Sequence, residues 1–142
     1  MYARSIDINA APAAVWSVLS DVEGWPQWTP STLRVRREDD GALRIGSSAV
    51  LQLRGRPGES RWTVTAVEHG RSFVWQSPSG PGLRVIAGHE IEPVGEGSRV
   101  RLWLRAAGPL GWLFDPLVAR MVRANVDAEA EGLKSRCERS QP

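Results

Sequence analysis

His89 is the residue whose type and setting best suit chemistry on a small molecule. Side chains two apart share one face of a strand, so His89 would lie on an apolar face with Val85, Ala87 and Ile91. An imidazole can donate or accept a hydrogen bond and change its charge near neutral pH, so in an apolar pocket it could orient a carbonyl or a phenol, or act as a general base. The alternative is a neutral histidine whose hydrogen bonds serve the fold alone.

Motifs for other kinds of catalysis are missing from the sequence. There is no Gly-x-Ser-x-Gly, no His-Glu-x-x-His and no Walker loop, and the 80–82 turn lacks a phosphate-binding context. Hydrolase, kinase and metalloenzyme functions are therefore disfavoured, and we predict no metal site and no cofactor. Cys137 is the single cysteine, which excludes an intrachain disulfide and favours a reducing, cytoplasmic compartment.

The aromatic composition indicates a lined cavity or groove. The chain has seven Trp in 142 residues but only two Phe and one Tyr. Tryptophan supplies a large, rigid apolar surface with one polar N–H. We therefore predict an apolar small molecule as the partner.

Charge and hydropathy argue against two other kinds of partner. The formal net charge is only +2, and the arginines are scattered in alternation with apolar residues rather than gathered in a run. Nucleic-acid binding is disfavoured because it requires a concentrated basic patch. No apolar stretch approaches the roughly 18 residues that a membrane span needs. The sequence does not indicate an oligomeric state.

The elements that would position these residues follow from periodicity. Residues 2–9 alternate as a half-buried strand does, and Pro12 opens a helix that should stop near Asp21. The 21–30 segment is broken by Gly24 and two prolines, so we expect a short second helix or a tight turn.

Residues 33–106 read as six strands separated by turn signals such as Asp40-Gly41. The short connections predict an antiparallel meander. Asp115, as N-cap, and Pro116 then open a helix that runs to about Glu138, which gives a length of about 33 Å at 1.5 Å per residue. The order of elements predicts one domain, 1–142, of the α+β class, with the helices gathered on one face of the sheet.

Several segments resemble the SRPBCC superfamily, the START-like or pollen-allergen-like fold, and within it the polyketide cyclase/dehydrase-like branch. The segments that carry the resemblance are 6–16, 19–21, 25–31, Trp62-Thr63-Val64, 71–75, 89–93, 97–100 and 133–138. The resemblance implies a helix-grip fold, in which a curved seven-stranded antiparallel sheet wraps around the long C-terminal helix and two short helices follow the first strand. It also implies a cavity between sheet and helix.

Strand parity and the resemblance together select the candidate ligand-binding residues. Leu51 and Leu53 share one face of their strand, and the resemblance places Trp25 and Trp28 at the lip of the cavity. The full candidate set is Trp25, Trp28, Leu51, Leu53, Trp62, Phe73, Trp75, Val85, His89, Leu117, Met121 and Asn125. The facing of Trp62 and Trp75 is left open. On the last helix, we interpret Asp127, Glu129 and Glu131 as its solvated face.

Three functions remain open at this point. The first is a module that binds an apolar or aromatic ligand of lipid-, polyketide- or quinone-like character. The second is a polyketide cyclase or dehydratase, in which His89 transfers a proton and the cavity wall folds the chain by proximity. This enzyme would need a second well-placed polar group, which the sequence does not identify. The third is a protein-interaction module with an exposed groove, or with Trp103 on its outer face.

Overall fold

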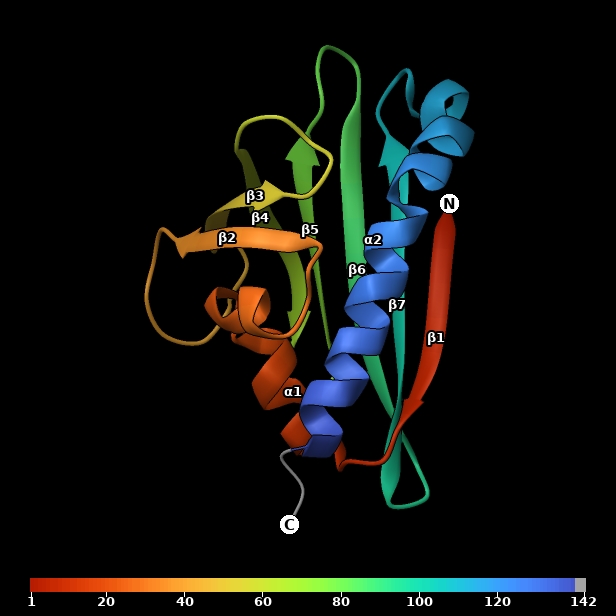
Figure 1. Ribbon diagram of the computed structural model, residues 1–142. Coiled ribbons are helices and arrows are strands. Elements are labelled where there is room, and N and C mark those ends of the chain that lie inside the picture. The colour runs from red at the N-terminus through yellow and green to blue at the C-terminus, as the bar shows by residue number, and fades with distance from the viewer. Residues whose placement is uncertain (140–142) are drawn as a thin grey trace.

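The computed structural model describes residues 1–139 (Figure 1). The last three residues of the predicted domain, 140–142, lie outside the described part. In chain order the elements are β1 (Tyr2–Ile8), α1 (Pro12–Ser20), the 3-10 helix η1 (Val22–Gln27), β2 (Thr32–Arg37), β3 (Ser48–Leu53), β4 (Ser60–Glu68), β5 (Ser72–Pro78), β6 (Arg84–Val94), β7 (Gly97–Ala107) and α2 (Gly111–Arg139).

The strands form a seven-stranded antiparallel sheet in the order β1-β7-β6-β5-β4-β3-β2. Strands β2 to β7 are a meander, as the turn signals predicted. Strand β1 closes the far edge by pairing with β7, with Ile6 opposite Val100. The first strand of the chain thus pairs with the last one, β7. The sheet formed by β2 to β7 can therefore curl around a central helix.

Helix α2 lies along the concave face of this sheet, in front of β6 and β7 and beside β1 (Figure 1). Strand β2 runs crosswise to these strands, so the sheet curls around the helix. Helix α1 and η1 sit together at the other side of α2 and close the lower part of the concave face. This is the α+β architecture that the order of elements predicted, in the helix-grip form that the resemblance implied.

The start of α1 follows its sequence signals. Pro12 is the first helical residue, where a missing N–H costs no hydrogen bond, and the Val15 N–H donates to the Ala11 carbonyl at 3.1 Å. Val15 and Leu19 lie one turn apart and are fully buried. The helix ends at Ser20, as the sequence predicted to within a residue.

The predicted start of the long helix was wrong. Helix α2 begins at Gly111, and the Phe114 N–H already donates to the Leu110 carbonyl at 3.2 Å. Asp115 does not cap the helix, because its carboxylate accepts the Ala106 backbone N–H at 2.8 Å and pairs with the N-terminal ammonium. Pro116 lies inside the helix, where it cannot donate a hydrogen bond to the Trp112 carbonyl, so α2 lacks one hydrogen bond near its start.

Strand β4 contains an irregularity that resolves a conflict in side-chain parity. Val64 pairs with Trp75 and Val67 pairs with Phe73, with a register shift between Val64 and Ala66. The extra residue turns both valines toward the concave side although they are three apart. Trp62, two before Val64, therefore faces inward with Trp75, which settles the facing that the sequence left open.

Trp103 lies on the convex face, as strand parity predicted, but it covers the sheet instead of projecting from it. A Cβ on Gly88 would lie 2.0 Å from the Trp103 ring, so the indole rests directly on the glycine backbone. Its Nε1–H donates to the Glu90 carboxylate at 2.6 Å. Trp103 is thus held by its own sheet, which removes it as a protruding contact residue.

Candidate functional site

A cavity of about 430 Å³ lies between the concave face of the sheet and the middle of α2. Its wall contains the indole rings of Trp25, Trp62 and Trp75, which come from η1, β4 and β5. The Trp25 and Trp75 ring centroids are 5.3 Å apart, and those of Trp62 and Trp75 are 5.8 Å apart. Three segments distant in sequence thus build one continuous aromatic wall.

Two of these indoles have their polar atom satisfied by the protein. Trp25 Nε1 donates to the Leu19 carbonyl and Trp62 Nε1 donates to Ser60 Oγ, both at 2.9 Å. Trp75 lines the cavity, and within residues 1–139 its Nε1 has no hydrogen-bond partner. The wall therefore presents mainly apolar ring surface, with one N–H donor to spare.

His89 enters the cavity from β6 and is held on two sides. Its ring stacks on Phe73 with centroids 4.1 Å apart and planes at 14°. Nδ1 lies 3.2 Å from the Phe73 carbonyl oxygen, and since that oxygen can only accept, Nδ1 carries the proton of this bond. Nε2 is left as the ring atom available to the cavity.

Glu129 of α2 lies next to His89 in the cavity wall. Its Oε1 is 3.6 Å from His89 Nε2, and the two side chains are only 16% and 3% exposed. Oε1 is buried and has no hydrogen-bond partner among residues 1–139. A buried carboxylate oxygen without a partner is costly, so Oε1 is available to accept a hydrogen bond from a ligand in the cavity.

The expectation that Glu129 lies on the solvated face of the helix was wrong. Asp127 and Glu131 do lie on the outer side, where both contact Arg4. Glu129 instead shares a face with Val126 and Leu133, three residues before it and four after it, and both are buried. That spacing is the signal in the sequence that could have placed Glu129 inward.

Asn125 and Arg54 form the rim of the cavity. Asn125 Nδ2 donates to the Arg54 carbonyl at 3.0 Å, and Arg54 donates back to Asn125 Oδ1 at 3.2 Å. These bonds tie the β3–β4 connection to α2. The rim is therefore polar and the interior apolar.

Nine of the twelve candidate residues line this cavity. They are Trp25, Leu51, Leu53, Trp62, Trp75, Val85, His89, Met121 and Asn125. Trp28 and Phe73 are buried beside the wall but do not line it; Phe73 supports His89, and the Trp28 ring packs on Trp25 at 5.8 Å. Leu117 does not line the cavity either, because it is 52% exposed on the outer side of α2.

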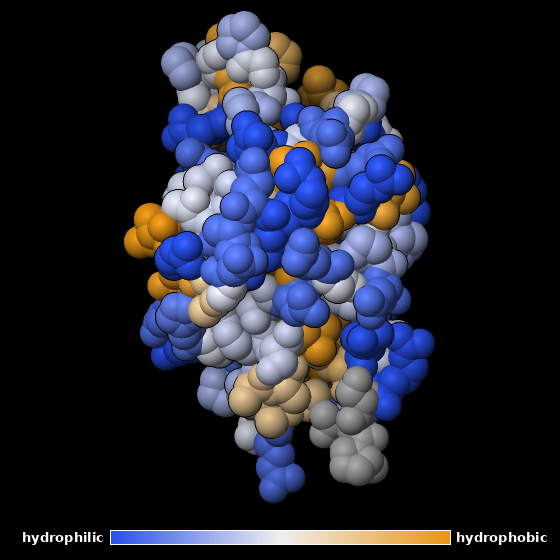
Figure 2. Space-filling model, turned by 90° about the vertical axis from the view of Figure 1, so that its left-hand side faces the viewer, coloured by the Kyte–Doolittle hydropathy of each residue, from blue (hydrophilic) through white to orange (hydrophobic). Residues whose placement is uncertain are grey.

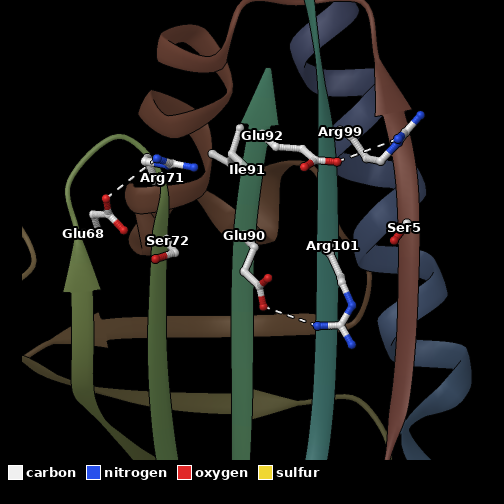
Figure 3. A pocket seen from close by; sticks show the side chains of 9 residues that line it. All are labelled: Ser5, Glu68, Arg71, Ser72, Glu90, Ile91, Glu92, Arg99 and Arg101. Atoms are coloured by element: carbon white, nitrogen blue, oxygen red, sulfur yellow. Dashed lines mark hydrogen bonds and ion pairs between the residues drawn. The ribbon is translucent and has the colours of Figure 1, made fainter. Parts of the chain in front are cut away.

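A second hollow, of about 350 Å³, lies on the convex face of the sheet (Figure 3). Its arginines are already paired: Arg71 with Glu68, Arg99 with Glu92, and Arg101 with Glu90. Because positive and negative side chains alternate and neutralise one another, this hollow offers no net charge to a ligand. Within residues 1–139, moreover, no three His, Cys, Asp or Glu side chains come together as metal ligands would.

The helix-grip fold and the internal cavity define the class of the protein, which is the START-like, SRPBCC superfamily. Within it, the chain belongs to the family described as polyketide cyclase/dehydrase and lipid transport, whose family model matches residues 2–138. No curated protein sequence matches this chain.

Solved structures share this fold at low sequence identity. A protein of Thermus thermophilus is 20% identical with a TM-score of 0.75, covering 99% of this chain and 98% of its own. The Zhui aromatase/cyclase of Streptomyces sp. R1128 is 19% identical with a TM-score of 0.73, covering 97% and 93%. A START superfamily protein of Mycobacterium smegmatis is 20% identical with a TM-score of 0.72, covering 99% and 98%. No described helix is long and apolar enough to cross a membrane.

Proposed function

We propose that this protein binds an apolar small molecule with an aromatic or polycyclic core in the cavity between the sheet and α2. The observation that carries the proposal is the aromatic wall of Trp25, Trp62 and Trp75 around about 430 Å³ of space. That volume lies within the range of about 300–1,000 Å³ that is usual for small-molecule sites. The lone, buried Cys137 supports a cytoplasmic setting as part of the same proposal.

The polar atoms of the cavity suggest how such a ligand would be oriented. Trp75 Nε1 can donate one hydrogen bond, and Glu129 Oε1 can accept one. A planar ring system that carries a carbonyl or ether oxygen at one position and a hydroxyl at another would satisfy both. The apolar rings would supply most of the affinity, and these two atoms the orientation.

Binding of 2-naphthol, a bicyclic phenol, to the purified protein tests the proposal by isothermal titration calorimetry. Ala87→Phe should fill the cavity, because Ala87 is a small residue of its wall, between Trp75 and Leu104 on the neighbouring strands. We expect saturable one-to-one binding and a loss of at least about tenfold in affinity in Ala87→Phe. Ala66→Phe, on the exposed side of β4, is the matched control and should bind as the parent does.

Native mass spectrometry of the protein as purified provides a second readout. A retained small molecule in the parent and in Ala66→Phe, but not in Ala87→Phe, would support the cavity as its site. Equal 2-naphthol affinity in both phenylalanine variants would refute the proposal.

A polyketide cyclase or dehydratase is the second candidate, and the His89–Glu129 pair favours it. This pair supplies the second polar group that such an enzyme needs. His89 Nε2 would take a proton from a carbon next to a substrate carbonyl, and Glu129 would stabilise the imidazolium that results. The cavity wall would hold a flexible chain in the folded shape that ring closure requires.

A further inference from the structure

The exposed hydrophobic side chains of this protein gather at one end. The large hydrophobic residues that are exposed within residues 1–139 are Met1, Leu33, Ile45, Val94, Leu110, Trp112, Leu113, Leu117 and Met121. Six of these nine lie at or beside the start of α2, where the N-terminus also pairs with Asp115 (Figure 1). The face in Figure 2 is largely hydrophilic, with its hydrophobic residues in small separate groups.

Trp112, Leu113, Leu117 and Met121 form what we call the α2 stripe. Leu113, Leu117 and Met121 follow one another at intervals of four residues, so they line up along one side of the helix. Trp112 is 78% exposed and Met121 is 69% exposed. No sheet residue covers the stripe, whereas the opposite side of the same turns packs on the sheet through Val118 and Val122.

Arginines without acidic partners surround the α2 stripe. Arg120 and Arg123 lie on the same exposed turns of α2, with the Arg123 guanidinium over the Tyr2 ring at 5.6 Å, and Arg54 and Arg56 lie on the neighbouring cavity rim. Within residues 1–139 none of the four forms an ion pair. Glu59 is the one acidic residue of the β3–β4 connection, and it pairs with none of them. The apolar stripe therefore sits in a local excess of positive charge, although the whole chain carries only +2.

We propose that the α2 stripe docks on the surface of an anionic lipid bilayer. Trp112, Leu113 and Leu117 would enter the interfacial layer, where tryptophan is favoured because its ring is apolar and its N–H stays near the headgroups. Arg120 and Arg123 would lie against the lipid phosphates, and each such arginine strengthens binding to an anionic surface by about fivefold.

A second copy of this chain fits the stripe less well. Two stripes packed face to face would bring Arg120 and Arg123 of both copies together, and Asp115, the acidic residue on the same turns, is already paired with the N-terminal ammonium. An anionic bilayer would contact both features of the patch. Its interfacial layer would cover the exposed hydrophobic side chains, and its phosphates would lie near the positive charge.

The position of the stripe also connects it with the cavity. Met121 belongs both to the stripe and to the cavity wall, so the docked surface would adjoin the cavity mouth. On the proposed function, an apolar ligand could then pass between bilayer and cavity without crossing water. This last step rests on the proposed function, but docking itself does not.

Sedimentation with sucrose-loaded vesicles tests the docking. The probes are vesicles of phosphatidylcholine with about 30% phosphatidylglycerol and vesicles of phosphatidylcholine alone. Comparing the two shows whether binding requires anionic lipid. We expect binding to the anionic vesicles that weakens as salt rises, since exposed charges are screened. The Trp112→Ser/Leu117→Ser double variant should lower the partition coefficient at least about tenfold, and Arg120→Gln/Arg123→Gln should lower it only on anionic vesicles.

The matched control is Leu33→Ser/Ile45→Ser, which changes two exposed hydrophobic residues elsewhere on the surface and should bind as the parent does. Thermal unfolding of each variant verifies that it is folded. A fluorescence blue shift on vesicle addition, lost in Trp112→Phe, would locate the contact, because Trp112 is the one largely exposed tryptophan within residues 1–139.

Absence of binding to anionic vesicles, or equal binding by the stripe and control variants, would overturn the proposal. So would dimerisation of the parent that the stripe variant abolishes in the absence of lipid binding. Ala87→Phe should dock like the parent, so failure of the cavity proposal leaves the docking result intact.

Discussion

His89 and Glu129 are forty residues apart in the chain and meet because β6 and α2 face each other across the cavity. Removing either side chain would leave the polar group of the other buried in an apolar wall without its neighbour, which is costly. Phe73 fixes the imidazole by ring stacking and by a hydrogen bond from Nδ1–H to its carbonyl oxygen, so the direction of Nε2 is fixed. The pair can thus serve either to orient a ligand or to move a proton, and a substitution separates the two roles.

The His89→Phe substitution replaces the imidazole by a somewhat larger aromatic ring that is apolar and cannot take a proton. If the cavity binds its ligand without transforming it, the affinity for 2-naphthol should stay within about tenfold, or 1.4 kcal/mol, in a calorimetric titration. Glu129→Gln serves as the companion variant because it keeps the shape of the side chain and removes its charge. For the cyclase or dehydratase function, loss of a general base should lower turnover by about 10²–10⁴-fold with affinity nearly intact. Turnover that survives in His89→Phe would show that His89 is not the proton acceptor of such a reaction.

Cys137 should be unreactive in the folded protein. It is buried in the core on the last turn of α2, and burial raises the pKa of its thiol to about 11. Since the thiolate is the reactive form, labelling by 5,5′-dithiobis(2-nitrobenzoate) at about pH 8 should be slow until guanidinium unfolds the chain. Rapid labelling of the native protein would show that the end of α2 opens in solution.

The same thiol predicts a dependence of stability on alkaline pH. The folded pKa is raised, so the contribution of Cys137 is fully present below about pH 9 and is lost as pH rises toward about 11, where the unfolded chain binds fewer protons. Urea unfolding of the parent and of Cys137→Ala across this window provides the measurement. The free energy of unfolding should fall more steeply with pH in the parent, and parallel profiles would contradict the prediction.

At the scale of elements, Gly132 decides how closely α2 approaches η1. A Cβ at this position would lie 2.0 Å from the Trp28 carbonyl oxygen, a backbone atom that cannot swing away. The glycine therefore lets the helix pack directly on Trp28, the residue that follows η1. This contact holds the aromatic segment of Trp25 and Trp28 against the cavity.

Gly132→Ala should destabilise the protein although alanine is the better helix former. The propensity gain is about 1 kcal/mol, and forcing the two backbones apart outweighs it. We expect a net loss of about 1–3 kcal/mol in urea unfolding. Ser135→Ala, exposed one turn further on, is the control and should change stability by less than about 0.5 kcal/mol. A Gly132→Ala protein as stable as the parent would mean that η1 can move away from α2 at little cost.

At the scale of the whole molecule, α2 is the main cover of the concave face. Its buried residues Val126, Ala130 and Leu133 close the core against β1, β7 and α1. Without the helix, the indole wall and the inner faces of β6 and β7 would be open to water.

Ending the chain after Leu110 should therefore abolish cooperative folding. The truncated protein should show no sigmoidal thermal transition by circular dichroism and no dispersed amide spectrum by NMR, whereas the full chain should show both. A cooperative transition in the truncated protein would contradict the view that sheet and helix form one folding unit.

Much of the architecture was predictable from the sequence alone, for a local reason. The alternation in β6 and β7 and the proline at the start of α1 are properties of residues close together in the chain. Strand parity and turn chemistry therefore indicated the meander, the inward side of His89 and much of the cavity wall. The resemblance added the helix-grip arrangement, which no local pattern contains.

The tertiary structure alone decided which polar groups meet in the cavity. Glu129 and Leu117 both lie on α2, and the sequence placed each on the wrong side, because the rotation of a helix is set by what it packs against. The start of α2 was also set by distant residues. The Ala106 N–H and the N-terminal ammonium bind the Asp115 carboxylate, so Asp115 does not cap the helix. The bulge in β4 likewise depends on its pairing with β5. Each outcome rests on contacts between residues far apart in the chain, and these exist only once the sheet has closed around the helix.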